Sequence, residues 1–286
     1  MKYSISTYSY SQLSAQGKSV KDLIALAASQ GFDGVEFVEF SPEDGMTELE
    51  YAGELRRECE KHGITPVCYS VGADLLYGSG GDLDAEVERL KGRVDIAEAL
   101  GVKKMRHDTT GGWRRGDRAG RGFDDALPRI IAGCRAVTEY AAGKGIRTMT
   151  ENHGQFSQES TRVEKIVNGV RHENFGLLID IGNFLCADED PAEAVGRLAP
   201  YAFHVHAKDF LFKSGDSPMF TSGFFGTRAG NRLRGTIIGH GVVPVYQCLN
   251  TIKNAGYDDF ISIEFEGMEN CADAAKIGLD TLRKIV

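Results

Sequence analysis

Residues 20–40 read VKDLIALAASQGFDGVEFVEF and contain the pattern that decides the fold. The apolar residues at the start of this stretch recur three and four positions apart, which is the spacing of one face of an α-helix. Gly31 then ends the helix, because glycine adopts the left-handed conformation after a last helical turn without steric cost. The apolar run Gly34–Phe40 that follows predicts a short buried β-strand.

The same unit of helix, glycine stop and short apolar strand recurs along the chain. Eight apolar segments alternate with helical ones, and strict alternation predicts a parallel sheet. Eight such units predict an α/β fold of the (β/α)8 TIM barrel class. The predicted helix stops are Gly31, Gly63, Gly101, Gly145 and Gly256.

The predicted barrel uses the whole chain, residues 1–286, as a single domain. Barrels of this class often exceed about 200 residues as one unit. A doubly wound open sheet is the structural alternative, but no G-x-G-x-x-G motif follows the first strand. The predicted strands are Tyr3–Tyr8, Gly34–Phe40, Thr65–Val71, Lys103–Asp108, Arg147–Glu151, Phe175–Asp180, Ala202–Ala207 and Phe260–Glu266.

Three long connections follow predicted strands, and in a barrel such connections lie on the catalytic face. Long connections there are usually functional. They are Gly72–Asp82, Thr109–Gly122 and Phe210–Gly239.

Composition and charge exclude several function classes. The formal net charge of -8 disfavours a nucleic-acid partner, because binding to phosphates relies on Lys and Arg. No apolar run approaches the roughly 18 residues of a membrane span, and the N-terminus lacks the apolar region of a secretory signal. The six cysteines form no C-x-x-C pair, which indicates reduced thiols in a cytoplasmic protein.

Four consecutive predicted strands end on polar residues that an apolar core would not select. Because side chains alternate between the two faces of a strand, the histidines of the seventh strand and the glutamates of the eighth face the barrel axis. The polar strand ends are Glu151-Asn152-His153, Asp180, His204-Val205-His206-Ala207-Lys208 and Glu264-Phe265-Glu266.

Three carboxylates and at least one imidazole therefore converge at one end of the barrel. Buried carboxylates repel one another, and a divalent cation relieves that repulsion. This ligand set suits Mn²⁺, Mg²⁺ or Co²⁺, with Zn²⁺ as a further candidate. Taken alone, Asp180 has a second interpretation as a helix cap, and a single strand histidine is more often a core residue than a ligand. The joint pattern favours one divalent metal ion.

These strand ends resemble those of the xylose isomerase-like superfamily, also called the sugar phosphate isomerase/epimerase family. The resemblance covers nearly the whole chain. It implies that the metal ligands are Glu151, Asp180, His206 and Glu264. The motifs that carry it are Gly31–Phe37, Glu151–Gly154, Leu178–Asn183, His204–Asp209 and Ile263–Gly267.

The resemblance also implies catalytic roles. Glu151 and Glu264 are expected to act as the acid/base pair around a metal-stabilised enediolate. Lys208 is expected to stabilise the developing oxyanion, with a salt bridge to Asp209 or Glu266 as the alternative.

Further polar and aromatic residues are candidates for contact with a small sugar-like substrate. Trp113 has the alternative of anchoring its own loop. Many family members carry histidine at the position of Asn183, and asparagine cannot shuttle a proton. The candidate substrate-binding residues are Glu36, Trp113, His153, Asn183, His204, His240 and Glu266.

The leading functional hypothesis is a metal-dependent isomerase or epimerase of a small ketose, keto-sugar or polyol derivative. A lyase of the same superfamily, such as an inosose-type dehydratase, is the first alternative. A non-catalytic sugar-binding or partner subunit is the second. The family's apurinic-site nucleases are disfavoured by Asn183 and by the acidic net charge. By analogy with relatives, which are often dimers or tetramers, a homo-oligomer is a candidate state.

Overall fold

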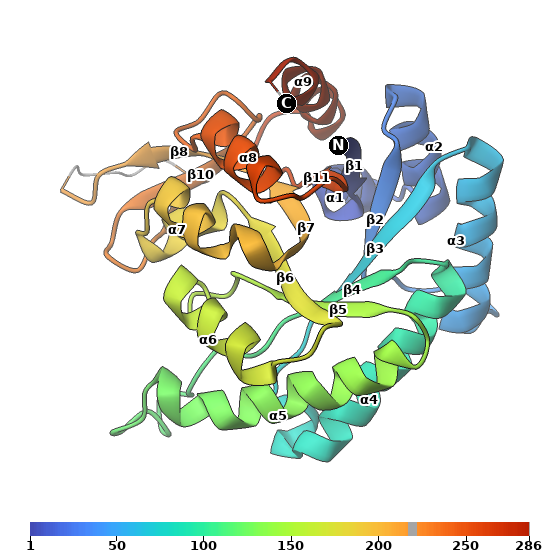
Figure 1. The fold of residues 1–286 in the computed structure, drawn as a ribbon. Helices are drawn as coiled ribbons and strands as arrows, with labels where there is room; N and C mark the ends of the chain where they lie inside the picture. The colour runs from blue at the N-terminus through green and yellow to red at the C-terminus, as the bar shows by residue number, and fades with distance from the viewer. Residues whose placement is uncertain (217–221, 286) are drawn as a thin grey trace.

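The computed structural model describes residues 1–216 and 222–285, and within them eight parallel strands form a closed barrel (Figure 1). The predicted single-domain (β/α)8 barrel is confirmed. The strands follow one another round the barrel in chain order. They are β1 (Lys2–Ser6), β2 (Gly34–Val38), β3 (Thr65–Val71), β4 (Lys104–His107), β5 (Arg147–Glu151), β6 (Phe175–Asp180), β7 (Ala202–Ala207) and β11 (Phe260–Ile263).

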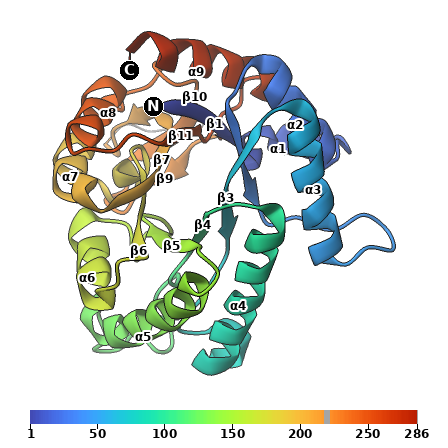
Figure 2. The same ribbon diagram turned by 45° about the vertical axis from the view of Figure 1, so that its right-hand side comes forward.

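Helices enclose the barrel on its outer side (Figure 2). The predicted glycine stops all lie in the left-handed region, with φ of 90° at Gly31 and 97° at Gly256. The helices are α1 (Ser11–Ala15), α2 (Val20–Gln30), α3 (Glu48–His62), α4 (Leu83–Leu100), α5 (Phe123–Ala142), α6 (Ser160–Val170), α7 (Pro191–Leu198), α8 (Val245–Asn254) and α9 (Cys271–Ile285).

β3, β5, β6 and β7 have the predicted bounds, whereas β1, β2, β4 and β11 are shorter than predicted. β1 gives way to a short 3-10 helix at Thr7–Tyr10. β11 ends at Ile263 because the following backbone bonds elsewhere: the Phe265 N–H donates to Ser9 Oγ at 2.9 Å. Glu264 and Glu266 therefore lie just beyond the strand.

Apolar side chains fill part of the inside of the barrel away from its mouth, next to buried polar groups such as His204 and Ser262. They come from the inward faces of the strands and form a cluster separate from the larger core between barrel and helices. The polar groups of the candidate site lie at the carboxyl ends of the strands. The apolar cluster consists of Val67, Cys68, Met149, Leu178 and Phe260, with Phe203 packed against it.

The long connection after β7 folds into a small antiparallel sheet. Its strands are β8 (Asp209–Lys213), β9 (Phe225–Gly226) and β10 (Arg232–Thr236), in the order β8-β10-β9. A backbone bridge between Gly235 and Gly267 joins it to the segment after β11. A side chain at Gly235 would lie 2.7 Å from the backbone of Glu266, so this contact requires glycine.

None of the helices in residues 1–216 and 222–285 is both long enough and apolar enough to cross a bilayer.

The connection after β3 is held by the buried carboxylate of Glu86, on α4. It accepts hydrogen bonds from the Asp74 N–H, the Ser79 hydroxyl and the Arg89 guanidinium. Burial alone would raise the pKa of Glu86, but these hydrogen bonds outweigh burial and lower the pKa from 4.5 to about 2.

Glu86→Gln should therefore reduce the free energy of unfolding at neutral pH. The native carboxylate keeps its charge below pH 4.5 while the unfolded one becomes protonated, so its contribution is complete above pH 4.5 and is lost as the pH falls toward 2. Urea unfolding at a series of pH values should show the wild-type advantage shrinking over this range. Glu88→Gln, at an exposed position of the same helix, is the matched control. A pH-independent difference would contradict this interpretation.

Candidate metal centre

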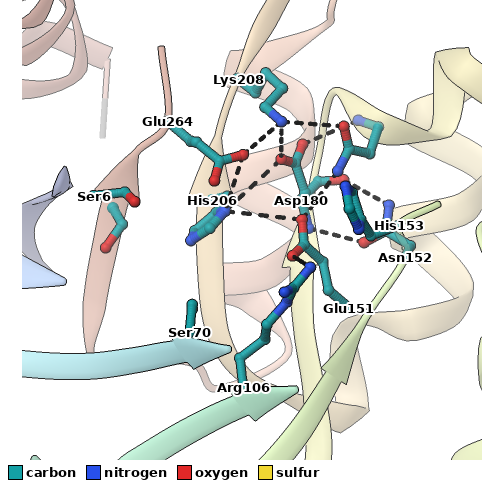
Figure 3. A network of polar contacts seen from close by, with 12 residues as sticks. Ser6, Ser70, Arg106, Glu151, Asn152, His153, Asp180, His206, Lys208 and Glu264 are labelled. Carbon is teal, nitrogen blue, oxygen red and sulfur yellow. Dashed lines mark hydrogen bonds and ion pairs between the residues drawn. The ribbon is translucent and has the colours of Figure 1, made fainter. Parts of the chain in front are cut away.

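Four side chains from the carboxyl ends of four strands meet in one cluster (Figure 3). Each of them offers one ligand atom, and these atoms all lie within 4.8 Å of one another. Glu151 ends β5, Asp180 ends β6, His206 lies near the end of β7, and Glu264 follows β11. The sequence-predicted ligand set is thus brought together at one point of the barrel mouth.

His206 directs a free nitrogen at the carboxylates. Its Nε2 lies 2.8 Å from Glu36 Oε2, and donation of the Nε2 proton to this carboxylate leaves Nδ1 with a lone pair. Nδ1 is buried and has no hydrogen-bond partner among the described residues. It lies 3.6 Å from Glu264 Oε2, 3.8 Å from Asp180 Oδ2 and 3.9 Å from Glu151 Oε1.

Asp180 uses its two oxygens differently. Oδ1 accepts the backbone N–H groups of Gly182 at 2.8 Å and Asn183 at 3.0 Å, so it caps the turn after β6. Oδ2 is buried and, in the described part of the chain, accepts no hydrogen bond. Asp180 can therefore cap the turn through Oδ1 and bind a metal ion through Oδ2.

Two buried cations balance part of the negative charge. Lys208 Nζ lies 2.5 Å from Glu264 Oε2, 3.2 Å from Asp180 Oδ2 and 3.5 Å from Glu266 Oε2. Arg106 Nη2 lies 2.7 Å from Glu151 Oε2. Lys208 therefore pairs with the cluster and with Glu266. The Asp209 carboxylate turns away and accepts backbone N–H groups of the 239–243 segment.

The residues present fit a divalent cation. His206 Nδ1 is buried and has no hydrogen bond within the described chain, which is costly without a ligand there. It faces Asp180 Oδ2, which pairs with the Lys208 ammonium group at 3.2 Å. Three carboxylates and one imidazole form an oxygen-rich set typical of Mn²⁺, Mg²⁺ or Co²⁺ sites. The Glu36–His206 hydrogen bond supplies the outer carboxylate that metal-binding histidines usually have.

The two glutamates of the cluster have opposite electrostatic environments. Burial is the largest influence on the pKa of Glu151 and raises it, against the lowering effect of Arg106. Burial would also raise the pKa of Glu264, but the positive charge of Lys208, whose ammonium group lies 2.5 Å from Glu264 Oε2, outweighs burial and holds this pKa well below its usual range. Glu151 thus retains a proton more readily than Glu264.

A cavity of about 290 Å³ opens over the cluster, and some predicted substrate-binding residues line it. His153 and Glu266 belong to its wall. Asn183 lies behind the wall, where its Nδ2 donates to Glu151 Oε1 at 3.0 Å and its Oδ1 accepts from Lys208 at 3.2 Å.

The other predicted substrate-binding residues lie outside this wall. Glu36 and His204 are fully buried beneath it, with His204 Nε2 lying 2.9 Å from Glu36 Oε2. Trp113 donates its indole N–H to the Gly122 carbonyl at 2.7 Å, which closes its own loop. His240 is exposed and is not part of the cavity wall.

Sequence reasoning left Tyr8, Ser70 and Arg106 without an assigned place in the site, and all three line the cavity. Tyr8 was expected at the end of a strand but lies in the 3-10 helix after β1, 42% exposed. For Arg106 the signal was present but ambiguous, since three consecutive polar residues end β4. Its guanidinium faces Glu151, and Asp108 also pairs with it, at 2.8 Å.

Comparison with known proteins agrees with this geometry. A family model described as "Xylose isomerase-like TIM barrel" matches residues 24–285. The chain belongs to this family. A search of curated proteins finds no significant match.

Solved structures of the same fold include three with informative descriptions, all below 20% sequence identity, so they establish a shared fold. The IolI protein with a bound zinc atom is 18% identical, with a TM-score of 0.76 over 100% of this chain and 98% of that one. D-psicose 3-epimerase from Clostridium cellulolyticum H10, solved with D-tagatose, is 16% identical, with a TM-score of 0.74 over 100% and 99%. The probable 3-DHS dehydratase AsbF from Bacillus anthracis is 19% identical, with a TM-score of 0.73 over 99% of each chain.

Asp180→Asn should abolish tight Mn²⁺ binding while the protein stays folded. The remaining amide oxygen can still accept the Gly182 and Asn183 N–H groups, but an NH₂ group replaces the free ligand oxygen. Isothermal titration with Mn²⁺ measures the first effect and thermal unfolding the second. Asp190→Asn, which alters the cap of α7 far from the cluster, is the control. Wild-type affinity in Asp180→Asn would exclude Asp180 as a ligand.

Glu36→Gln should weaken Mn²⁺ binding by about 10–100-fold, the usual effect of removing the outer carboxylate of a ligand histidine. The amide removes the charge that orients the His206 Nε2 proton. Ser70→Ala is the matched control, because it removes only the hydrogen bond to the other oxygen of Glu36. Equal metal affinities in Glu36→Gln and Ser70→Ala would show that Glu36 does not position His206.

Proposed function

We propose that this protein is a divalent-metal-dependent isomerase or epimerase of a small ketose, keto-sugar or polyol derivative. One observation carries the proposal: Glu151 and Glu264 line the same cavity and have different partners, Arg106 for Glu151 and Lys208 for Glu264. Two carboxylates arranged in this way supply one proton donor and one proton acceptor at a single substrate.

Glu264 is the proposed base. Lys208 contacts its Oε2 at 2.5 Å and favours the ionised form, whereas Oε1 has no hydrogen bond in the described residues. Oε1 is therefore free to take a proton from a carbon next to the substrate carbonyl. Lys208 lies deep in the same wall, where its ammonium group stabilises negative charge that develops on the substrate.

Glu151 is the proposed acid. Its Oε2 is held by Arg106 and its Oε1 by Asn183, so the carboxyl group has a fixed orientation toward the cavity. This orientation places Glu151 to return a proton to the substrate on the side away from Glu264. Return to the same carbon inverts its configuration, and return to the neighbouring position completes an isomerisation.

The proposed metal is held by Glu151, Asp180, His206 and Glu264, with Mn²⁺, Mg²⁺ or Co²⁺ favoured by the oxygen-rich ligand set. When bound, such an ion acts as a Lewis acid toward a carbonyl oxygen and makes the neighbouring C–H group more acidic. The fold shared with D-psicose 3-epimerase and the zinc-bound IolI protein supports this class of chemistry by analogy.

A lyase of the same family is the second candidate, favoured by a specific pair of residues. His153 lies in the cavity wall with its Nδ1 2.9 Å from Asp108 Oδ1. Burial lowers the pKa of His153, but the Asp108 hydrogen bond and the charge of Glu151 outweigh burial and raise the pKa. A protonated imidazole at this place can donate to a leaving hydroxyl, as a dehydratase requires.

Mn²⁺-loaded protein in D₂O should exchange a C–H proton next to the carbonyl of at least one member of a panel of ketoses, 3-keto-sugars and inososes. NMR follows the exchange. Glu264→Gln should reduce the rate by at least about 100-fold, which is the usual contribution of a general base. His153→Asn should leave the exchange intact if the protein is an isomerase or epimerase.

Other outcomes are equally informative. Exchange accompanied by loss of a hydroxyl group, with the loss but not the exchange abolished in His153→Asn, would assign the protein as a lyase. Wild-type exchange in Glu264→Gln would exclude Glu264 as the base. Absence of exchange with the whole panel, in protein that binds Mn²⁺, would count against enolisation and favour a sugar-binding role.

A further inference from the structure

A second cavity, of about 370 Å³, adjoins the catalytic cavity at the barrel mouth. The two cavities share Val38 and Glu39 in their walls. The second lies where α1, α2 and the start of α3 gather beside the end of β2 (Figure 2). The two cavities therefore lie next to each other, on either side of these two residues.

The shared wall is fixed in place. The Val38 N–H donates to Thr7 Oγ1 at 3.1 Å. The Glu39 carboxylate accepts the Gly72 N–H at 3.0 Å and lies 3.4 Å from Arg93 Nε. The wall is thus a permanent divider between the two cavities, with bonds on both sides, and the space beyond it is preformed.

The two cavities differ in chemistry. The catalytic one is lined by Arg106, Lys208 and three glutamates besides Glu39 and carries most of the charge. The floor of the second is apolar and aromatic: Phe40 packs edge-on against Tyr51, with ring centroids 5.6 Å apart, beside Val20 and Leu23. Most of its polar residues, including Ser14, Lys18, Ser41 and Glu43, lie on the exposed rim. An apolar floor with a polar rim is typical of a pocket for a ring or an alkyl group.

We propose that this second cavity, lined by Val20, Leu23, Phe40 and Tyr51, is a subsite for an apolar group attached to the substrate. The substrate class is then a polyhydroxylated carbonyl compound that bears an aryl or alkyl substituent. The inference rests on the proposed function for the polyhydroxylated part, since the metal cluster must hold that part. It goes beyond that function by requiring a two-part substrate.

The test uses two ketose probes that differ only in the substituent: 1-O-methyl-D-fructose and 1-O-phenyl-D-fructose. Both are titrated by NMR into the Mg²⁺-loaded full chain. The phenyl probe should bind at least about tenfold more tightly, because its ring buries apolar surface on the floor of the second cavity. Contacts between its aromatic protons and the ring of Phe40 should appear as intermolecular NOEs.

Two variants test whether the phenyl group of the probe binds in the second cavity. Ser41→Trp fills the second cavity from its exposed rim, and Val20→Asp adds a charge to it. Each should remove the preference for the phenyl probe and leave Mg²⁺ affinity unchanged. Ser29→Trp, an exposed position of α2 outside the cavity wall, is the matched control and should retain the preference.

The proposal is wrong if the phenyl probe binds no more tightly than the methyl probe, including the case in which neither binds. It is also wrong if the preference persists in both Ser41→Trp and Val20→Asp, because the ring then binds elsewhere. A preference for the phenyl probe without C–H exchange on any ketose would keep the subsite and reject the isomerase function. C–H exchange on a ketose without a preference for the phenyl probe would keep the isomerase function and reject the subsite.

Discussion

The burial of several carboxylates around one imidazole is the constraint on which the rest of this structure depends. Negative groups this close together are tolerated only when each one has a partner. Lys208 and Arg106 provide fixed positive charge on two sides of the cluster, and His206 connects it to Glu36 below. The barrel suits this arrangement, since every strand delivers one side chain to the same mouth while apolar residues fill part of the interior behind it.

Much of the fold could be predicted from the sequence because local signals agreed with the tertiary structure. Helix-ending glycines and short apolar runs mark the alternation, and β3, β5, β6 and β7 begin and end where predicted. The strand predicted at β11 was too long because of a tertiary contact. The Phe265 N–H donates to the hydroxyl of Ser9, which is far away in the chain, and the strand pairing ends there. No sequence pattern within residues 260–266 predicts that contact.

Some residues of the candidate site could likewise be predicted from the sequence, and others could not. Period-two alternation places His206 and Glu264 on the inner side, and the structure brings them together with Glu151 and Asp180. Which partner Lys208 selects was open, because that choice depends on the distances between strands. Arg106 could not be assigned, because Arg106, His107 and Asp108 are consecutive and alternation does not show which of them faces inward. Glu36 shows most clearly what the sequence could not predict. Its position in the sequence suggested contact with the substrate, but the side chain lies deep in the barrel and bonds two histidines, His204 and His206.

The small sheet after β7 has a consequence for how this chain can vary. Its Gly235 end is joined by backbone to the segment that carries Glu266, and Thr236 bonds Glu269 nearby. The turn between β9 and β10 is bonded to the connection after β6: the Arg228 N–H donates to the Cys186 carbonyl at 3.1 Å, and Thr227 and Asn231 donate to Asp188. Insertions and deletions are therefore constrained at both of these places. The small sheet thus couples the segment that carries Glu266 to the segment that follows Asp180.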